Sequence, residues 1–319
     1  MKRLFLLVII VFSTHLLNAC DFCNCYLGLN PHYKKNIIGL RYHYMSYNGT
    51  HHHISEFGDA TLSEKDFYEK RSNIELHGQW YPIQKLQLIF SLPYIYNAEG
   101  VSAKGEQATV NHHHHGDDSA GDEPIKGIGD PIVIAHYQMF NKTNMDSTKF
   151  SHRLLAGGGI KLPTGKYKLG TDADPLERTH QPGTGSWDFI ASASYLGKIN
   201  RAGFNLNVSY LFTTINSESF QFGNKFNANA IVYYQSNIKK SKLFPSIGTF
   251  VEQADKDWNY NYYISNSGGT IIYAHAGLDF YFNKIAINTA FQLPVSQTLN
   301  MPQPEMNYRI ITGISVAIN

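Results

Sequence analysis

Two runs of consecutive histidines could bind a metal ion. Their members are His51, His52, His53, His112, His113, His114 and His115. Imidazole suits zinc, copper and nickel, and five carboxylates between residues 106 and 123 would raise the local cation concentration around the second run. The sequence therefore predicts metal binding in two loops, with these three metals as candidate ions and no cofactor required. The alternative is that both runs are polar loops with only incidental affinity.

Three cysteines lie close together near the N-terminus, at Cys20, Cys23 and Cys25. Their thiolates could bind copper(I) or zinc. Leu17-Asn18-Ala19-Cys20 also has the spacing of a lipoprotein cleavage site, in which Cys20 would carry the lipid. A disulfide between two of the three is a third interpretation, because the periplasm is oxidising. The sequence leaves these interpretations open, and so small and clustered a set cannot staple a large fold.

A further set of polar groups alternates with apolar residues along much of the chain. In one segment Leu40, Tyr42 and Tyr44 fall on one side, with Arg41 and His43 opposite. Alternation with a period of two is typical of a β-strand with one apolar face. About twelve such segments follow one another between Asn36 and the C-terminus, an even number as expected for a bacterial single-chain barrel. The sequence therefore predicts an all-β fold, a transmembrane antiparallel β-barrel of about twelve strands.

The connections between the predicted strands support a barrel independently. Short links alternate strictly with long ones, as in outer-membrane barrels with short periplasmic turns and longer outer loops. This alternation predicts that both termini are periplasmic. Aromatic residues are expected to form two girdles at the rims. The outer girdle would contain Tyr44, Tyr96, Trp187 and Phe212, and the inner girdle Trp80, Tyr195, Tyr234 and Phe282. A secreted β-sandwich would show the same alternation and is the alternative fold.

The N-terminus has the pattern of a secretory signal peptide: two basic residues, a short apolar run and a break at Asn18-Ala19-Cys20. We therefore divide the chain into a signal peptide at residues 1–19, a periplasmic cysteine-containing segment at 20–35 and an outer-membrane barrel at 36–319. A hydrophobic content of 43% with only 16% charged residues suits large surfaces that face lipid. The net charge of +2 gives no electrostatic case for nucleic acid. The expected partners are the lipid bilayer and a small solute or metal ion.

The polar face of the predicted strands would line the barrel interior. Its candidate lining residues are Arg41, His43, Glu75, His77, Asp130, His136, Arg153, Lys161, Asp188, Lys225, Glu252, His275, Asp279 and Arg309. One interpretation is a polar conduit whose charges select solutes. The other is cross-strand ion pairing that fills a narrow barrel, since twelve strands lie between the packed eight-stranded and the aqueous sixteen-stranded cases. Balanced signs argue against a strong anion or cation filter.

Two glycine-containing motifs flank one of the long connections, namely Gly157-Gly158-Gly159-Ile160-Lys161-Leu162-Pro163-Thr164-Gly165 and Gly183-Thr184-Gly185-Ser186-Trp187-Asp188-Phe189. Together they resemble the outer-membrane transporter-like barrels named for a MetA pathway of phenol degradation. The resemblance implies a small-molecule channel or uptake protein. From the residues themselves, Gly157 and Gly159 would face the interior and allow a bend or a close approach of another segment.

These observations predict an outer-membrane channel or transporter-like barrel for a small solute. One form of this prediction is a metal-related role. The alternatives are a structural, plugged barrel and a metal-binding surface protein without transport. An outer-membrane hydrolase is a further alternative. We expect no enzyme, because no G-x-S-x-G nucleophile elbow occurs and no set of serine, histidine and carboxylate is marked.

Overall fold

The computed structural model describes residues 35–52, 64–102, 125–144, 146, 148–167, 181–301 and 303–318. Its elements are β1 (Ile37–His52), β2 (Glu64–Ile83), β3 (Leu86–Ser102), β4 (Ile125–Ile128), β5 (Ile132–Lys142), β6 (Ser151–Lys161), β7 (Asp188–Ile199), β8 (Ala202–Phe212), β9 (Phe220–Gln221), β10 (Lys225–Tyr234), β11 (Ser236–Ile238), β12 (Ser241–Ala254), β13 (Trp258–Asn259), β14 (Tyr262–Tyr263), β15 (Gly269–Phe282), β16 (Ile285–Leu299) and β17 (Glu305–Ala317). No helix in the described part of the chain is both long and apolar enough to span a bilayer.

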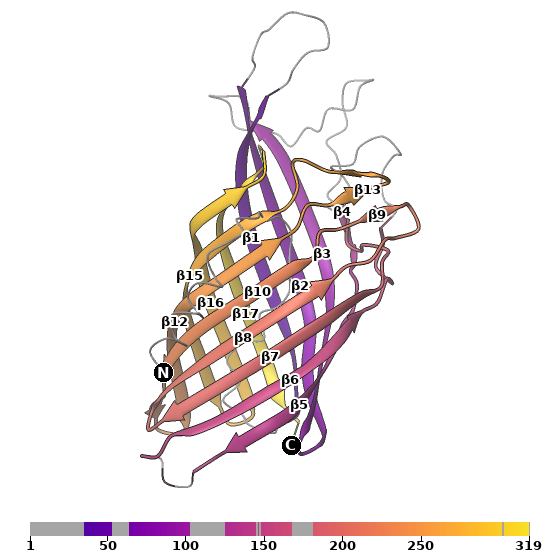
Figure 1. The fold of residues 1–319 in the computed structure, drawn as a ribbon. Helices are drawn as coiled ribbons and strands as arrows, with labels where there is room; N and C mark the ends of the chain where they lie inside the picture. Colours follow the sequence, from indigo (N-terminus) through magenta and orange to yellow (C-terminus); the bar gives the residue numbers. More distant parts are fainter. Residues whose placement is uncertain are drawn as a thin grey trace, which may run out of the picture.

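The strands form a closed antiparallel barrel (Figure 1). The first and last strands pair with each other, from Ile37 opposite Ala317 onward. The ring then continues in chain order, and β10 pairs with β12 to complete it. The predicted antiparallel barrel of about twelve strands is confirmed, with 12 strands in the ring. Closure pairs the backbone N–H and C=O groups of every strand edge. Lipid offers no hydrogen bonds to groups left unpaired.

The outward face of the barrel is apolar. Leu40, Ile74 and Phe189 each expose 51% of their surface there. Their strand neighbours Arg41, Glu75 and Asp188 point inward and are nearly or fully buried. Such a surface is stable in contact with lipid and unfavourable in contact with water, because the transfer of apolar area from water to hydrocarbon is favourable.

Short turns join many of the strands at one end of the barrel. Asn200 and Asn283 have positive φ values of 52° and 53° in turns of this kind, a conformation that asparagine tolerates better than most residues. The longer connections leave the opposite end, which we call the long-loop rim. The sequence predicts that this rim is the outer one.

One predicted strand begins later in the structure than expected. The alternation from Asp130 to Met139 predicts a strand that includes Asp130, but Asp130 lies before β5, in a break between β4 and β5. Pro131 has no N–H to donate, so the ladder cannot continue through it. Single backbone bonds bridge the break instead, from Gly129 N to Pro93 O at 2.8 Å and from Leu162 N to Pro131 O at 2.9 Å.

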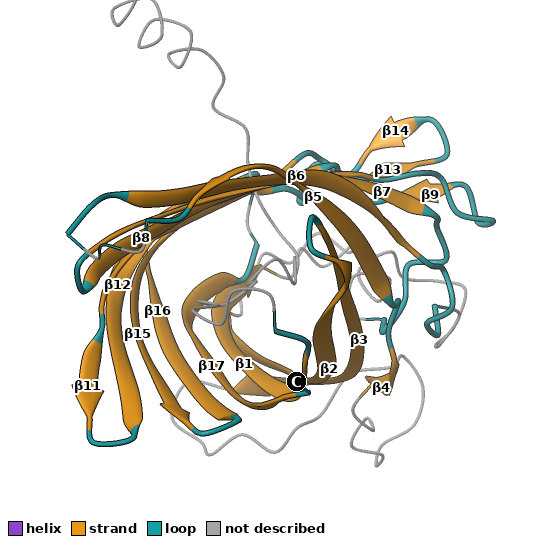
Figure 2. Ribbon diagram, turned by 90° about the horizontal axis from the view of Figure 1, so that it is seen from below, coloured by secondary structure: helices purple, strands orange, loops and turns teal. Residues whose placement is uncertain are grey.

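A second, three-stranded sheet of β14, β13 and β9 lies outside the barrel ring. It is built from the connections between β8 and β10 and between β12 and β15. Viewed along the barrel, it projects beyond the wall near β7 (Figure 2). The sequence did not predict these strands, because each is only two residues long and carries no alternation.

Candidate functional site

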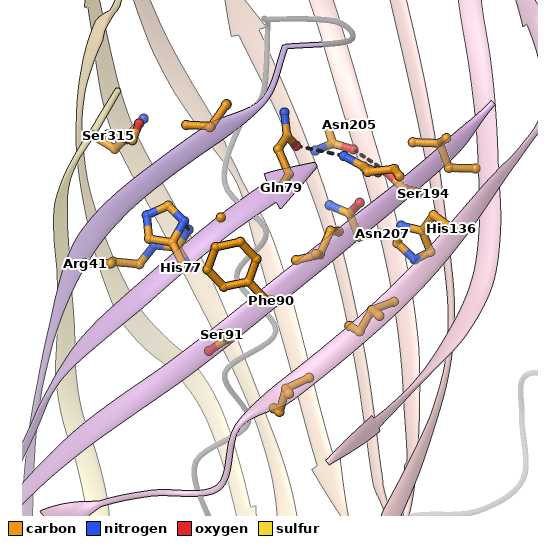
Figure 3. Close-up of a pocket in the computed structure, with 18 of the residues that line it drawn as sticks. Arg41, His77, Gln79, Phe90, Ser91, His136, Ser194, Asn205, Asn207 and Ser315 are labelled. Carbon is orange, nitrogen blue, oxygen red and sulfur yellow. Dashed lines mark hydrogen bonds between the residues drawn. The ribbon is translucent and has the colours of Figure 1, made fainter. Parts of the chain in front are cut away.

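The barrel encloses a cavity of about 120 Å³ at its short-turn half. Ten of the barrel strands contribute to its wall: β1, β2, β3, β5, β6, β7, β8, β15, β16 and β17. Figure 3 shows Arg41 and His77 on one side, with Ser194, Asn207 and His136 on the other. The alternation of each strand places these groups inside, because every second side chain of a barrel strand points to the interior.

A buried carboxylate holds the β1–β2 side of this cavity. Glu75 is 2% exposed and lies opposite Arg41 in the strand register. Arg41 Nη1 donates to Glu75 Oε2 at 3.2 Å, and His43 Nε2 lies 3.2 Å from the same oxygen. Ser91 Oγ donates to Glu75 Oε1 at 2.5 Å. Because both carboxylate oxygens have partners, the Arg41–Glu75 pair adds little net charge to the cavity.

Amides and hydroxyls supply much of the remaining polar wall. Gln87 Nε2 donates to Gln79 Oε1 at 2.8 Å, and Ser194 Oγ lies 3.5 Å from Asn205 Oδ1. Apolar side chains interrupt these groups, namely Ile89, Ile132, Ile134, Leu155, Leu196 and Tyr281. The wall can therefore contact both the polar and the apolar part of a small molecule.

A serine and a histidine meet beside the cavity in a way that resembles part of a hydrolase site. His136 Nε2 lies 2.6 Å from Ser192 Oγ. The other ring nitrogen, His136 Nδ1, is buried and has no hydrogen-bond partner among the described residues. A nucleophilic serine needs its histidine oriented by a third group. Among the described residues, no third group orients His136.

A second part of the interior is filled by side chains. An apolar cluster joins β1, β10, β12, β15, β16 and β17. Its buried members are Met45, Tyr47, Ile231, Phe250, Ile271, Tyr273, Ala290, Met306 and Ile311. Arg309 lies over the Tyr273 ring at 4.6 Å and donates to Glu252 Oε1 at 2.7 Å. The interior is therefore packed at the level of this cluster, and the cavity lies nearer the short turns.

The two motifs that resemble the transporter-like family meet at the break before β5. The Asp130 carboxylate accepts hydrogen bonds from Gly165 N, Thr184 N and Thr184 Oγ1, each at 2.8 Å. Lys161 Nζ lies 3.4 Å from Asp130 Oδ2 and 2.5 Å from Asp188 Oδ2. We call these five residues the Asp130 clasp. It fastens both ends of the connection between β6 and β7 to the barrel wall.

The glycines of the first motif allow strands β5 and β6 to approach closely. A Cβ at Gly157 would lie 1.9 Å from Ala135 O, and one at Gly159 would lie 2.4 Å from Val133 O. No side chain fits at either distance. The close packing of β5 against β6 therefore requires glycine at these two positions, in line with the expected close approach of another segment.

The structure places the candidate interior residues as follows. Eleven of the candidate lining residues are buried, namely His43, Glu75, Asp130, His136, Arg153, Lys161, Asp188, Lys225, His275, Asp279 and Arg309. Arg41, His77 and Glu252 are partly buried. Only Arg41, Glu75, His77, His136 and Arg153 of this set line the cavity. The cavity residues that the charge pattern missed are uncharged, above all Gln79, Gln87, Ser194, Asn205 and Asn207, and only their inward position in each strand could have indicated them.

The predicted metal ligands lie almost entirely outside the described residues. This is true of His53, His112–His115 and the three cysteines, while for His51 and His52 the structure describes only the backbone of β1. Within the described part of the chain, no group of three or more metal-ligating side chains comes together. The metal sites remain predictions from the sequence.

The closed barrel with an apolar outer surface and a polar interior defines an outer-membrane β-barrel protein, as predicted. Its fold is similar to that of the COG4313 outer membrane channel from Pseudomonas putida F1. That similarity has a TM-score of 0.58 at 14% identity and covers 94% of this chain and 100% of that one. At this identity it shows the fold alone.

Two further solved barrels resemble the chain too weakly to carry an argument. The beta domain of the Bordetella autotransporter Brka has a TM-score of 0.44 at 9% identity, covering 89% of this chain and 100% of that one. The TodX deltaS2S3 mutant monoaromatic hydrocarbon channel has a TM-score of 0.35 at 9% identity, covering 96% and 97%. No protein-family model matches the chain, and no curated protein matches it by sequence. Membership of the family suggested by the two motifs therefore stays a prediction.

Proposed function

We propose that this barrel is an outer-membrane channel for a small solute. The observation that carries the proposal is the cavity enclosed by ten strands of the barrel, with a wall of mixed amide, hydroxyl and apolar groups. The similar fold from Pseudomonas putida F1 is described as an outer membrane channel, which supports the same role here.

The cavity dimensions limit the solutes that we expect to pass. A volume of about 120 Å³ is somewhat smaller than the roughly 150 Å³ of an apolar protein cavity that accommodates benzene. A molecule smaller than benzene, such as glycerol, or a few waters, would therefore fit without rearrangement. Larger solutes such as disaccharides would not.

The charges around the cavity indicate weak charge selection. Arg41 is paired with Glu75 and Arg71 with Glu69, and further buried carboxylates lie in the Asp130 clasp or near Arg309 and Asn288. A strong filter needs a ring of like charges that face the path. We therefore expect a channel that prefers small solutes of low charge.

The competing function is a structural barrel with a closed interior. It is favoured by the apolar cluster around Tyr273 and by the buried ion pairs, which fill the β10–β17 side. The two candidates differ in one property. The channel passes small solutes across a membrane, and the closed barrel does not.

Flux into liposomes that hold the purified barrel tests the proposal. A small neutral solute such as glycerol should enter these liposomes faster than empty liposomes, and sucrose should not. Gln87→Ala, which removes a polar side chain from the cavity wall, should raise the flux. Leu88→Ala is the matched control, because Leu88 is the next residue on the same strand and lies on the opposite face. Absence of flux for every solute in the wild type would favour the closed barrel.

A further inference from the structure

The small sheet outside the barrel carries exposed tyrosines that neither the channel nor the barrel core uses. Tyr260, Tyr262 and Tyr263 are 62%, 57% and 63% exposed, and all lie in or beside the hairpin of β13 and β14. Trp258 packs edge-on against Tyr263, with ring centroids 4.4 Å apart. We call the sheet of β9, β13 and β14 the aromatic flap.

The two connections that form the flap are joined to each other. Phe220 is fully buried and packs against Phe222, with ring centroids 4.8 Å apart. Tyr260 N donates to Ser219 O at 2.9 Å, and Gly223 N donates to Asp257 Oδ1 at 2.7 Å. The tyrosines are therefore exposed on a sheet whose strands are paired and packed.

The flap has no charge at its tip. From Trp258 to Ala274 the chain contains no Asp, Glu, Lys, Arg or His. Trp258 Nε1 donates to Tyr260 O at 2.6 Å, and Asn259 Nδ2 donates to Tyr262 Oη at 3.1 Å. The polar atoms of this segment are thus partly satisfied internally, which lowers the cost of removing it from bulk water.

The flap continues the lipid-facing surface of the barrel. Trp187 is 53% exposed at the end of the wall, and its carbonyl accepts a hydrogen bond from Thr214 Oγ1 at 2.7 Å. The exposed Ile215 follows, and the same connection leads to Ser219 beneath Tyr260. In Figure 2 the flap projects sideways from the wall, outside the barrel ring.

We propose that the aromatic flap lies in the interfacial layer of the bilayer, at the boundary of headgroups and acyl chains. Tyrosine and tryptophan concentrate at this depth because the ring contacts acyl carbon and the hydroxyl or indole N–H contacts water and headgroups. Exposed uncharged rings on a flap whose connection is bonded to the wall at Trp187 have this chemistry. The flap thereby anchors one sector of the long-loop rim to the membrane.

The fluorescence of Trp258 measures where the flap lies. The chain has three tryptophans, so Trp80→Phe and Trp187→Phe leave Trp258 as the single reporter. The protein is folded into phosphatidylcholine vesicles, some with bromine on the acyl chain near the headgroup and some with bromine near the methyl end. We expect strong quenching by the shallow bromine, weaker quenching by the deep bromine, and less quenching by aqueous iodide than in denaturant.

Substitution of the tyrosines tests their role. In the single-tryptophan protein, Tyr260→Ser, Tyr262→Ser and Tyr263→Ser together should abolish the quenching by shallow bromine and increase quenching by iodide. The matched variant with phenylalanine at the same positions should keep the quenching by lipid. Heat-modifiable electrophoretic mobility checks that each variant holds a folded barrel.

Two results would overturn the proposal. The first is that Trp258 of the parent protein is quenched by iodide and by neither brominated lipid. This result would place the flap in water, as a surface for a soluble partner. The second is that the folded serine variant is quenched by lipid as strongly as the parent.

Discussion

Removing the cation of the Asp130 clasp should destabilise the barrel strongly. Lys161→Met keeps the length and apolar stem of the side chain but removes its ammonium group. In the wild type, Lys161 Nζ lies between the two carboxylates, 2.5 Å from Asp188 Oδ2 and 3.4 Å from Asp130 Oδ2. The substitution therefore leaves two buried carboxylates without their shared cation.

The size of the stability loss depends on the hydrogen bonds that each carboxylate keeps. Asp130 still accepts from Gly165 N and twice from Thr184, whereas Asp188 keeps the bond from Thr214 N at 3.0 Å. Breaking a buried ion pair by removing one partner costs about 3–5 kcal/mol. Because Asp130 retains its other donors, we expect a loss near the lower end, about 3 kcal/mol of unfolding free energy.

Urea titration of the barrel in lipid vesicles measures this loss. Lys198→Met is the control, since Lys198 is less buried and its ammonium donates to the neutral Gln235 Oε1; we expect a change of about 1 kcal/mol or less. Adding Asp188→Asn to Lys161→Met should recover part of the stability, because it removes one uncompensated charge. An unchanged urea midpoint for Lys161→Met would refute the assignment of the clasp as a stabilising ion network.

Three further predictions concern the motifs. Gly157→Ala should prevent formation of the heat-modifiable barrel, because its Cβ would lie 1.9 Å from Ala135 O. Gly313→Ala is the control: its Cβ comes no closer than 3.0 Å to another atom, so it should cost only about 1–3 kcal/mol of unfolding free energy in urea titration. Equal effects of the two substitutions would contradict the geometry. Thr184→Val should lower the urea midpoint by the equivalent of about 1–3 kcal/mol, since it removes one donor to a buried carboxylate; no shift would argue against the clasp. Replacing His112–His115 with serine should weaken zinc and copper binding in titration calorimetry. Metal binding by the wild type should weaken below about pH 6 as imidazole protonates. Equal metal affinity in the wild type and the serine variant would show that the run is only a polar loop.

The fold was predictable because period-two alternation fixes which face of each strand meets lipid. Leu40 and Ile74 on one face, with Arg41 and Glu75 on the other, are enough to specify both surfaces once closure is required. The break at Pro131 was readable in principle, since proline cannot donate to the ladder. The period-two alternation alone placed Asp130 in the strand that the structure begins at Ile132.

The contacts inside the barrel were not predictable from the same pattern. Arg41 and Glu75 face each other on neighbouring strands, but Arg309 and Glu252 belong to β17 and β12, which two other strands separate. Their meeting depends on the stagger and curvature of the whole ring, which local periodicity does not contain. The clasp and the aromatic flap are likewise made by connections that are distant in sequence. The cavity wall is mainly uncharged, so a search for charged residues found only part of it.

Cysteine accessibility inside the cavity tests the channel most directly. In a background with the three native cysteines replaced by serine, Ser194→Cys places a thiol in the cavity wall, and Ala193→Cys places one on the outward face of the same strand. Both proteins are reconstituted into liposomes, and glycerol flux is recorded before and after a water-soluble, membrane-impermeant methanethiosulfonate reagent. We predict that the reagent modifies Ser194→Cys and lowers its flux, while Ala193→Cys retains its flux. A folded Ser194→Cys barrel that reacts with the reagent and conducts unchanged, or that shows no flux at any stage, would contradict a solute path through this cavity.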